Sequence, residues 1–153
     1  MADLLTHLAS ARIPGIFLRD RRVQALLVLG SFLPDIVSKG LYHVTRSSDN
    51  FIVPSHSVTG LLALCFALSF LLEERIRRPG FGALLAGAYL HLAVDLLKDQ
   101  GGAGLLGVFH PFSPAGFQLG LVDPENVILL LPIDVAILVG AWLLERRLRR
   151  VRQ

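Results

Sequence analysis

The sequence predicts an all-α membrane protein, a polytopic helical bundle with four transmembrane helices and an N-terminal segment that could add a fifth. The first observation is composition: the chain of 153 residues is 53% hydrophobic and 18% charged, whereas soluble domains carry about 25% charged residues. The second is that the apolar residues form long runs with no polar face. The third is that the arginines flank these runs and are absent from within them. A chain of this length is expected to form one domain, here membrane-embedded over residues 1–153.

Four apolar runs are the expected transmembrane helices, at residues 23–38, 56–72, 81–97 and 127–144. Crossing the hydrocarbon core takes about 20 residues, within a range of about 17–25. The runs are therefore near the lower limit, and their flanking residues are expected to extend them. The alternative is a buried bundle in a soluble protein, which is disfavoured because four helices that are apolar all round have no polar face to show water.

The basic residues orient the predicted bundle, because cytoplasmic loops are enriched in lysine and arginine. Eleven arginines fall in segments 19–22, 73–78 and 146–152, whereas loops 39–55 and 98–126 together hold three basic residues. The three arginine-rich segments, and the C-terminus with them, are therefore expected in the cytoplasm, with the two loops outside. The predicted location is a bacterial inner membrane, with the lipid bilayer as partner. Nucleic acid is not expected, since no basic face is interleaved with aromatic residues, and the oligomeric state is not predicted.

One histidine and one carboxylate in the third run are the centre of the candidate site. His91 and Asp95 lie one turn apart on the same helix face, in a segment where neither is expected without a partner. The predicted orientation puts Asp35 and His56 at the same depth near the outer face. Two imidazoles and two carboxylates suit zinc, manganese or iron better than magnesium or calcium. Taken singly, each could instead be a packing histidine, a helix cap or an interfacial residue.

Other polar residues leave alternatives open. His7 and Asp3 form a second pair with the same spacing, which joins the site only if the N-terminal segment reaches the outer face. Pro14 argues against a clean span, so a re-entrant or interfacial segment is the alternative. Asp99 continues the helix face of the central pair and could orient a ligand or position water. Asp134 lies inside the last run, and the sequence identifies no partner for it.

Short motifs follow one another in a distinctive order: Thr6-His7-Leu8, then Leu33-Pro34-Asp35-Ile36, His56-Ser57, Tyr89-Leu90-His91-Leu92-Ala93-Val94-Asp95, and a glycine-rich loop reaching Pro111-Phe112-Ser113. This order resembles the YdjM-like family of bacterial inner-membrane, metal-dependent hydrolases, over roughly residues 3–114. Families of this type are similar to zinc-dependent phospholipase C, whose all-helical fold gathers histidine and aspartate ligands around a metal cluster.

The resemblance implies a set of metal ligands: His7, Asp35, His56, His91 and Asp95. The implied cofactor is a divalent metal ion, zinc first, with manganese and iron as alternatives. Two departures from the family pattern stand out. Val37 occupies a place where members often carry an acidic residue, and residues 51–55 lack a His-Arg pair. Fewer ligands favour a site for one or two metal ions.

The predicted function is that of a membrane-bound metal-dependent hydrolase, acting on a phosphoester or lipid-linked substrate at the outer face of the membrane. The catalytic candidates are Asp99 and Asp35, either of which would act as general base. The alternative is a non-catalytic metal-binding or structural membrane protein. A lipid phosphatase of the phosphatidic-acid type is disfavoured, because no arginine lies just upstream of His91 and a phosphate would lack its cationic clamp.

Overall fold

The computed structural model describes residues 4–45, 54–98, 107–113, 118–122 and 127–151. Within these residues the fold is all-helical, which confirms the predicted class, and it has no β-strand. The helices, in chain order, are α1 (Leu4–Gly15), α2 (Arg21–Thr45), α4 (Val58–Ser69), α5 (Glu74–Leu97) and α6 (Val127–Val151). An isolated parallel bridge joins Lys98, directly after α5, to Val122.

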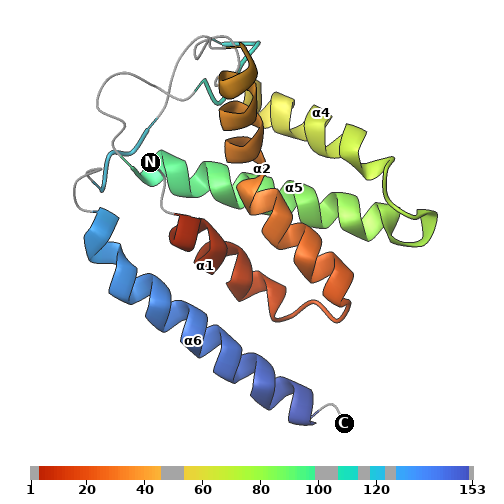
Figure 1. Cartoon of the computed structure of the whole chain (residues 1–153), viewed down its shortest axis with the longest axis vertical. Helices are drawn as coiled ribbons and strands as arrows, with labels where there is room; N and C mark the ends of the chain where they lie inside the picture. The colour runs from red at the N-terminus through yellow and green to blue at the C-terminus, as the bar shows by residue number, and fades with distance from the viewer. Residues whose placement is uncertain (1–3, 46–53, 99–106, 114–117, 123–126, 152–153) are drawn as a thin grey trace.

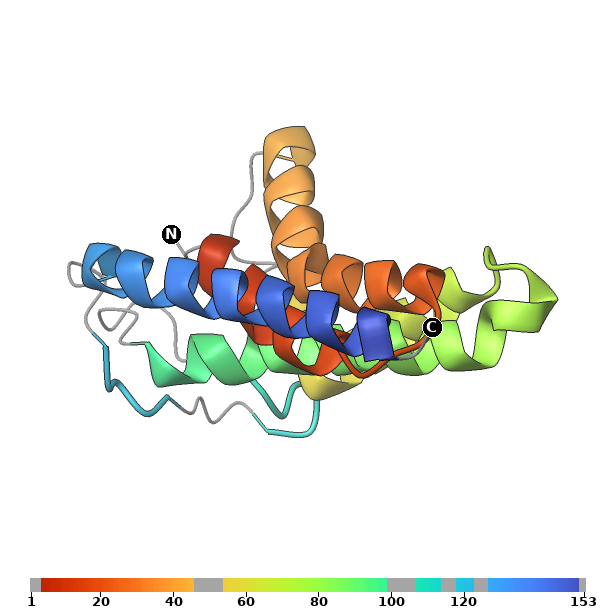
Figure 2. The ribbon, with the colours of Figure 1, turned by 90° about the horizontal axis from the view of Figure 1, so that it is seen from below.

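Helix α5 is the centre of the bundle, as Figures 1 and 2 show. On one side, α4 packs against it through a buried cluster that includes Leu61, Cys65 and Leu84. On another side, α1 and α2 meet it in a second cluster that includes Ala11 and Leu27. Helix α6 lies at the outside of the bundle, along α1. Helix α5 thus contributes to both apolar clusters.

Helices α2 and α5 approach each other at backbone distance. A Cβ atom added at Gly30 would overlap the carbonyl oxygen of Leu84, and one added at Gly87 would overlap that of Leu27. Small residues allow this kind of close packing between helices in membranes. The contact matters for the site because Gly30 and Gly87 lie close in sequence to the polar residues of both helices.

The helix boundaries differ from the predicted runs in three places. Residues 73–78 lie between the second and third predicted runs, yet α5 begins at Glu74, because arginine and glutamate are good helix formers. Helix α2 continues past residue 38 to Thr45, into the predicted loop 39–55. Helix α4 covers only part of run 56–72, beginning after Ser57, whose side chain accepts a hydrogen bond from the Gly60 amide as an N-cap.

Two helices in the described residues are long and apolar enough to cross a membrane: Arg21–Gly40 of α2, and α5. Helices α1 and α4 have 12 residues each. The predicted bundle of four transmembrane helices is therefore supported at two positions and stays a prediction at the other two. Large apolar side chains are nevertheless exposed along α4 and α6: Leu62, Phe66, Phe70, Leu131, Ile133, Val139, Trp142 and Leu143. Exposed apolar surface of this extent marks a face that contacts lipid or another protein.

Candidate metal centre

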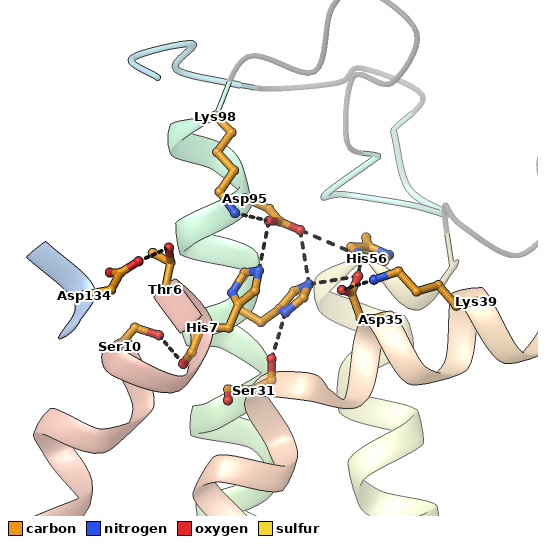
Figure 3. A network of polar contacts seen from close by, with 11 residues as sticks. Thr6, His7, Ser10, Ser31, Asp35, Lys39, His56, Asp95, Lys98 and Asp134 are labelled. Atoms are coloured by element: carbon orange, nitrogen blue, oxygen red, sulfur yellow. Dashed lines mark hydrogen bonds and ion pairs between the residues drawn. The ribbon is translucent and has the colours of Figure 1, made fainter. Parts of the chain in front are cut away.

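Five predicted residues from four different parts of the chain come together at one place. His7 lies on α1, Asp35 on α2, and His56 in the turn before α4, while His91 and Asp95 lie on α5. Figure 3 shows their side chains converging between the helices. The predicted convergence of three segments is thus present, and α1 brings a fourth. The role of these residues as metal ligands stays a prediction.

The ligand atoms of the cluster face one another at short range. Nε2 of His91 lies 3.1 Å from Oδ2 of Asp95, and Nε2 of His7 lies 3.4 Å from Oδ1 of the same carboxylate. Nε2 of His56 is 3.9 Å from a carboxylate oxygen of both Asp35 and Asp95. Ligands about 2.0–2.2 Å from a tetrahedral zinc ion are separated by about 3.4 Å. The observed separations are those of a site that an ion of this size would fit.

The backbone of α2 fixes the proton on His91. Nδ1 of His91 lies 2.8 Å from the carbonyl oxygen of Ser31, and a carbonyl oxygen only accepts, so Nδ1 donates. In the neutral ring, Nε2 then carries a lone pair, which faces Asp95 and, at 3.9 Å, Asp35. Three acceptors facing one another are repulsive unless a proton or a metal ion lies between them. Metal-binding histidines are typically oriented by this kind of second hydrogen bond.

Histidine stacking favours a metal ion over protons. The rings of His7 and His91 are stacked, with centroids 3.9 Å apart and an angle of 18° between planes. Two imidazolium rings in this arrangement would repel each other in surroundings of low dielectric constant. A divalent ion would instead attract the neutral nitrogen atoms and both carboxylates together.

The cluster is buried and incompletely hydrogen-bonded. His7 is 1% exposed, His91 0% and Asp95 3%. Both ring nitrogens of His7, and Nε2 of His91, have no partner with hydrogen-bond geometry, although the two Nε2 atoms lie within ion-pair distance of Asp95. Buried polar atoms without hydrogen bonds are uncommon and call for an explanation. A bound cation would supply one, because it accepts these lone pairs directly.

The donor atoms form two overlapping triads. One consists of His7, His91 and Asp95, and the other of Asp35, His56 and His91, with the ligand atoms of each triad within 4.8 Å of one another. His91 belongs to both. Nitrogen and oxygen donors in this mixture suit zinc, manganese and iron. The residues therefore fit one divalent ion, or two ions that share His91.

Two lysines contact the carboxylates of the cluster, which sequence reasoning missed. Nζ of Lys39 lies 2.5 Å from Oδ2 of Asp35, and Nζ of Lys98 lies 3.4 Å from Oδ1 of Asp95. The signal was present in the spacing, since the pairs are four and three residues apart on α2 and at the end of α5. Charge counting treated both lysines only as loop charges.

Asp134, left without a partner by the sequence, accepts a hydrogen bond from the Thr6 hydroxyl at 2.7 Å. Further along the same two helices, Arg12 pairs with Glu145. These two pairs show that α1 and α6 run in the same direction. Asp99 lies outside the described residues, so its role as general base stays a prediction.

The chain matches the family described as YdjM inner membrane protein over residues 1–151, which includes every residue of the cluster. Comparisons with curated proteins and with solved structures gave no match. The resemblance drawn from the motifs is confirmed at the level of the family. The chain belongs to the YdjM inner membrane protein family.

Proposed function

We propose that this protein is a metal-dependent hydrolase of the inner membrane that acts on an ester, including a phosphoester or a lipid-linked substrate, at the outer face. The observation that carries the proposal is the orientation of His91. Its Nδ1 donates to the Ser31 carbonyl, so Nε2 presents a lone pair to two carboxylates. A buried arrangement of acceptors that face one another calls for a cation, and the mixed donors favour a metal ion of the zinc type.

The exposure of the side chains suggests which residues bind the ion and which one acts as base. His7, His56, His91 and Asp95 would hold the ion, and such an ion supplies Lewis-acid activation of an ester oxygen and of water. The side chain of Asp35 is 17% exposed, against 4% for Asp95, so Asp35 is the carboxylate that incoming water reaches. In this proposal Asp35 accepts the proton from that water as general base.

The proposed topology has four membrane crossings with the C-terminus in the cytoplasm. The arginine bias supports this orientation, and α6, at 25 residues, would be about 38 Å long. Because α1 runs parallel to α6, the start of α1 would lie on the outer side, where His7 can join the site. Helix α1 would then lead from the outer side toward the cytoplasmic segment 19–22, which corresponds to the N-terminal fifth segment that the sequence allowed.

Metal content and hydrolysis test the central proposal together. Wild type and His91→Ala would be purified in detergent, and bound zinc, manganese and iron measured beside activity on a panel of carboxylic and phosphoric esters. We expect His91→Ala to lose both metal and activity. His43→Ala, an exposed histidine of α2, is the matched control and is expected to retain both. Equal metal content in wild type and His91→Ala would refute the metal centre.

A non-catalytic metal-binding protein is the second candidate. It is favoured by the position of Asp35 in the second triad. If Asp35 binds the ion there, no described carboxylate of the cluster remains to act as base. Metal that is lost in His91→Ala, together with no hydrolysis of any ester by the loaded wild type, would support this candidate.

Orientation has its own test. Single cysteines introduced at Ser48 and Arg149 would be labelled in intact cells with a membrane-impermeant thiol reagent, in a Cys65→Ser background that removes the one native thiol. We expect labelling at position 48 and none at position 149. Labelling of Arg149→Cys from outside would overturn the proposed topology.

A further inference from the structure

Two lysines reach the metal centre from different helices, and Figure 3 shows both pointing at its carboxylates. Lys98 follows α5 and contacts Asp95, while Lys39 lies on α2 and contacts Asp35. Lys98 is only 7% exposed, and an ammonium group at that depth is costly unless it has a counter-charge. Each carboxylate of the centre therefore already has a cationic partner before any metal ion is added.

The charges of the centre balance only in the absence of metal. The carboxylates of Asp35 and Asp95 cancel the ammonium groups of Lys39 and Lys98, and the histidines are neutral when they bind a metal. A divalent ion would add two positive charges that no described residue of the cluster compensates. In surroundings of low dielectric constant such an excess is expensive. An anion that enters with the substrate would remove it.

A phosphate group fits this requirement best. Phosphate monoesters carry about 1.5 to 2 negative charges at pH 7 and three strong acceptor oxygens. Lysine ammonium groups bind phosphate oxygens through charge-assisted hydrogen bonds. The sequence disfavoured a lipid phosphatase because no arginine was found to bind the phosphate. Lys39 and Lys98 supply cations that could bind it instead.

We propose that Lys39 and Lys98, together with the metal ion, form a receptor for the phosphate group of the substrate, whether a lipid headgroup or a soluble phosphate. The positive charge of a bound ion weakens the pairing of the two carboxylates with Lys39 and Lys98, and the ammonium groups become available to the phosphate oxygens. The inference rests on the proposed function, because it needs a metal ion at the cluster. It narrows the substrate from esters in general to phosphate compounds.

Linkage between metal and phosphate gives the test, since each ligand must raise the affinity of the other by the same factor. The affinity of the detergent-purified protein for manganese would be measured by titration with and without inorganic phosphate, as a function of the free manganese concentration. Sulfate in place of phosphate is the control for ionic strength. For wild type we expect phosphate to tighten manganese binding about tenfold or more. For Lys98→Gln and Lys39→Gln we expect manganese binding without phosphate to be unchanged or tighter, because a competing cation is gone. In both variants the gain from phosphate should shrink to about twofold or less.

Arg22→Gln is the matched control. Arg22 pairs with Glu73 at 3.0 Å and lies thirteen residues before Asp35 on α2, which is about 20 Å along the helix. The variant removes one positive charge at a distance from the centre, so phosphate should raise its manganese affinity as much as in wild type. A loss of gain in Arg22→Gln equal to that in the lysine variants would show a general charge effect and overturn the receptor.

The outcomes separate the receptor from the metal centre. Manganese binding by wild type with no gain from phosphate overturns the receptor and leaves the metal centre standing. A full gain in both lysine variants assigns the anion to the metal alone and also overturns it. No manganese binding at all overturns both. Repeating the measurement in lipid nanodiscs with and without phosphatidic acid identifies the source: a gain only with phosphatidic acid indicates a headgroup, and a gain with inorganic phosphate indicates a soluble compound.

Discussion

Helices α2 and α5 meet through glycine, whereas α1 and α6 meet through polar side chains. At the first seam, a Cβ atom on Gly87 would overlap the backbone of α2. At the second, Thr6 donates to Asp134 at 2.7 Å and Arg12 pairs with Glu145. The glycine seam is set by backbone contact and tolerates almost no adjustment. The polar seam depends on two interactions, each of which can be removed without adding volume.

The candidate metal centre lies across both seams, so the residues proposed as its ligands are held in two ways. Asp35 is on α2, and His91 and Asp95 are on α5, so the glycine seam sets their separation. His7 is on α1, next to Thr6, so its position depends on the polar seam. The positions of Asp35, His91 and Asp95 therefore depend on backbone packing between α2 and α5. His7 is carried by a helix whose attachment can be weakened selectively.

The glycine seam should give the largest loss of stability. Gly87→Ala puts a Cβ atom against the Leu27 carbonyl, which no side-chain rotation relieves, and overpacking of this kind costs about 3 kcal/mol of the free energy of unfolding. Gly82→Ala on the same helix is the control, because an added Cβ there meets nothing within 4 Å. Thermal unfolding in detergent checks the pair. Equal midpoints for the two variants would show that the close approach of α2 and α5 is not present.

Among the ligands, His91 should matter more than His7 for metal affinity. His91 belongs to both triads and His7 to one, so His91→Ala leaves neither triad complete. We expect His91→Ala to weaken metal binding by more than about 100-fold, above the usual effect of a second-shell partner, and His7→Ala to weaken it less. Metal titration of both purified variants tests the order. A greater loss in His7→Ala would place the ion in the His7 triad, away from the position that the two triads share.

Loss of the polar seam should act on the metal through His7. Asp134→Ala or Thr6→Val removes the hydrogen bond between α1 and α6 beside the centre, and such an orienting interaction is worth about tenfold in metal affinity. Val135→Ala, at the neighbouring exposed position of α6, is expected to have no effect. Combining Asp134→Ala with His7→Ala should add nothing to His7→Ala alone, as a double-mutant cycle would show. Additive losses would mean that Asp134 acts by another route.

The sequence was sufficient to predict that these residues come together and insufficient to predict their contacts. Hydropathy and arginine positions fix how far along a membrane helix a residue lies, which is why Asp35, His56, His91 and Asp95 were expected together. Neither signal fixes rotation about the helix axis. The contact between Thr6 and Asp134 depends on that rotation, so the sequence could not predict it.

Helix ends were also poorly predicted, for a related reason. Residues 73–78 are charged and lie outside the predicted runs, although α5 begins at Glu74. Hydropathy reports the polarity of a segment and not its backbone conformation. Glutamate and arginine favour helix wherever water can reach them, so a transmembrane helix can extend through a charged segment beyond its apolar run.

An exposed ion pair between the two central helices should give the smallest effect. Arg22 and Glu73 pair at 3.0 Å, with side chains 64% and 70% exposed, at the end of the glycine seam far from the metal centre. Pairs with this exposure contribute about 0 to 1 kcal/mol to the free energy of unfolding. Arg22→Gln should therefore shift the thermal midpoint far less than Gly87→Ala, and added salt should remove the remaining difference because it screens exposed charges. A shift as large as that of Gly87→Ala would mean that electrostatic contacts, and not glycine packing, hold α2 against α5.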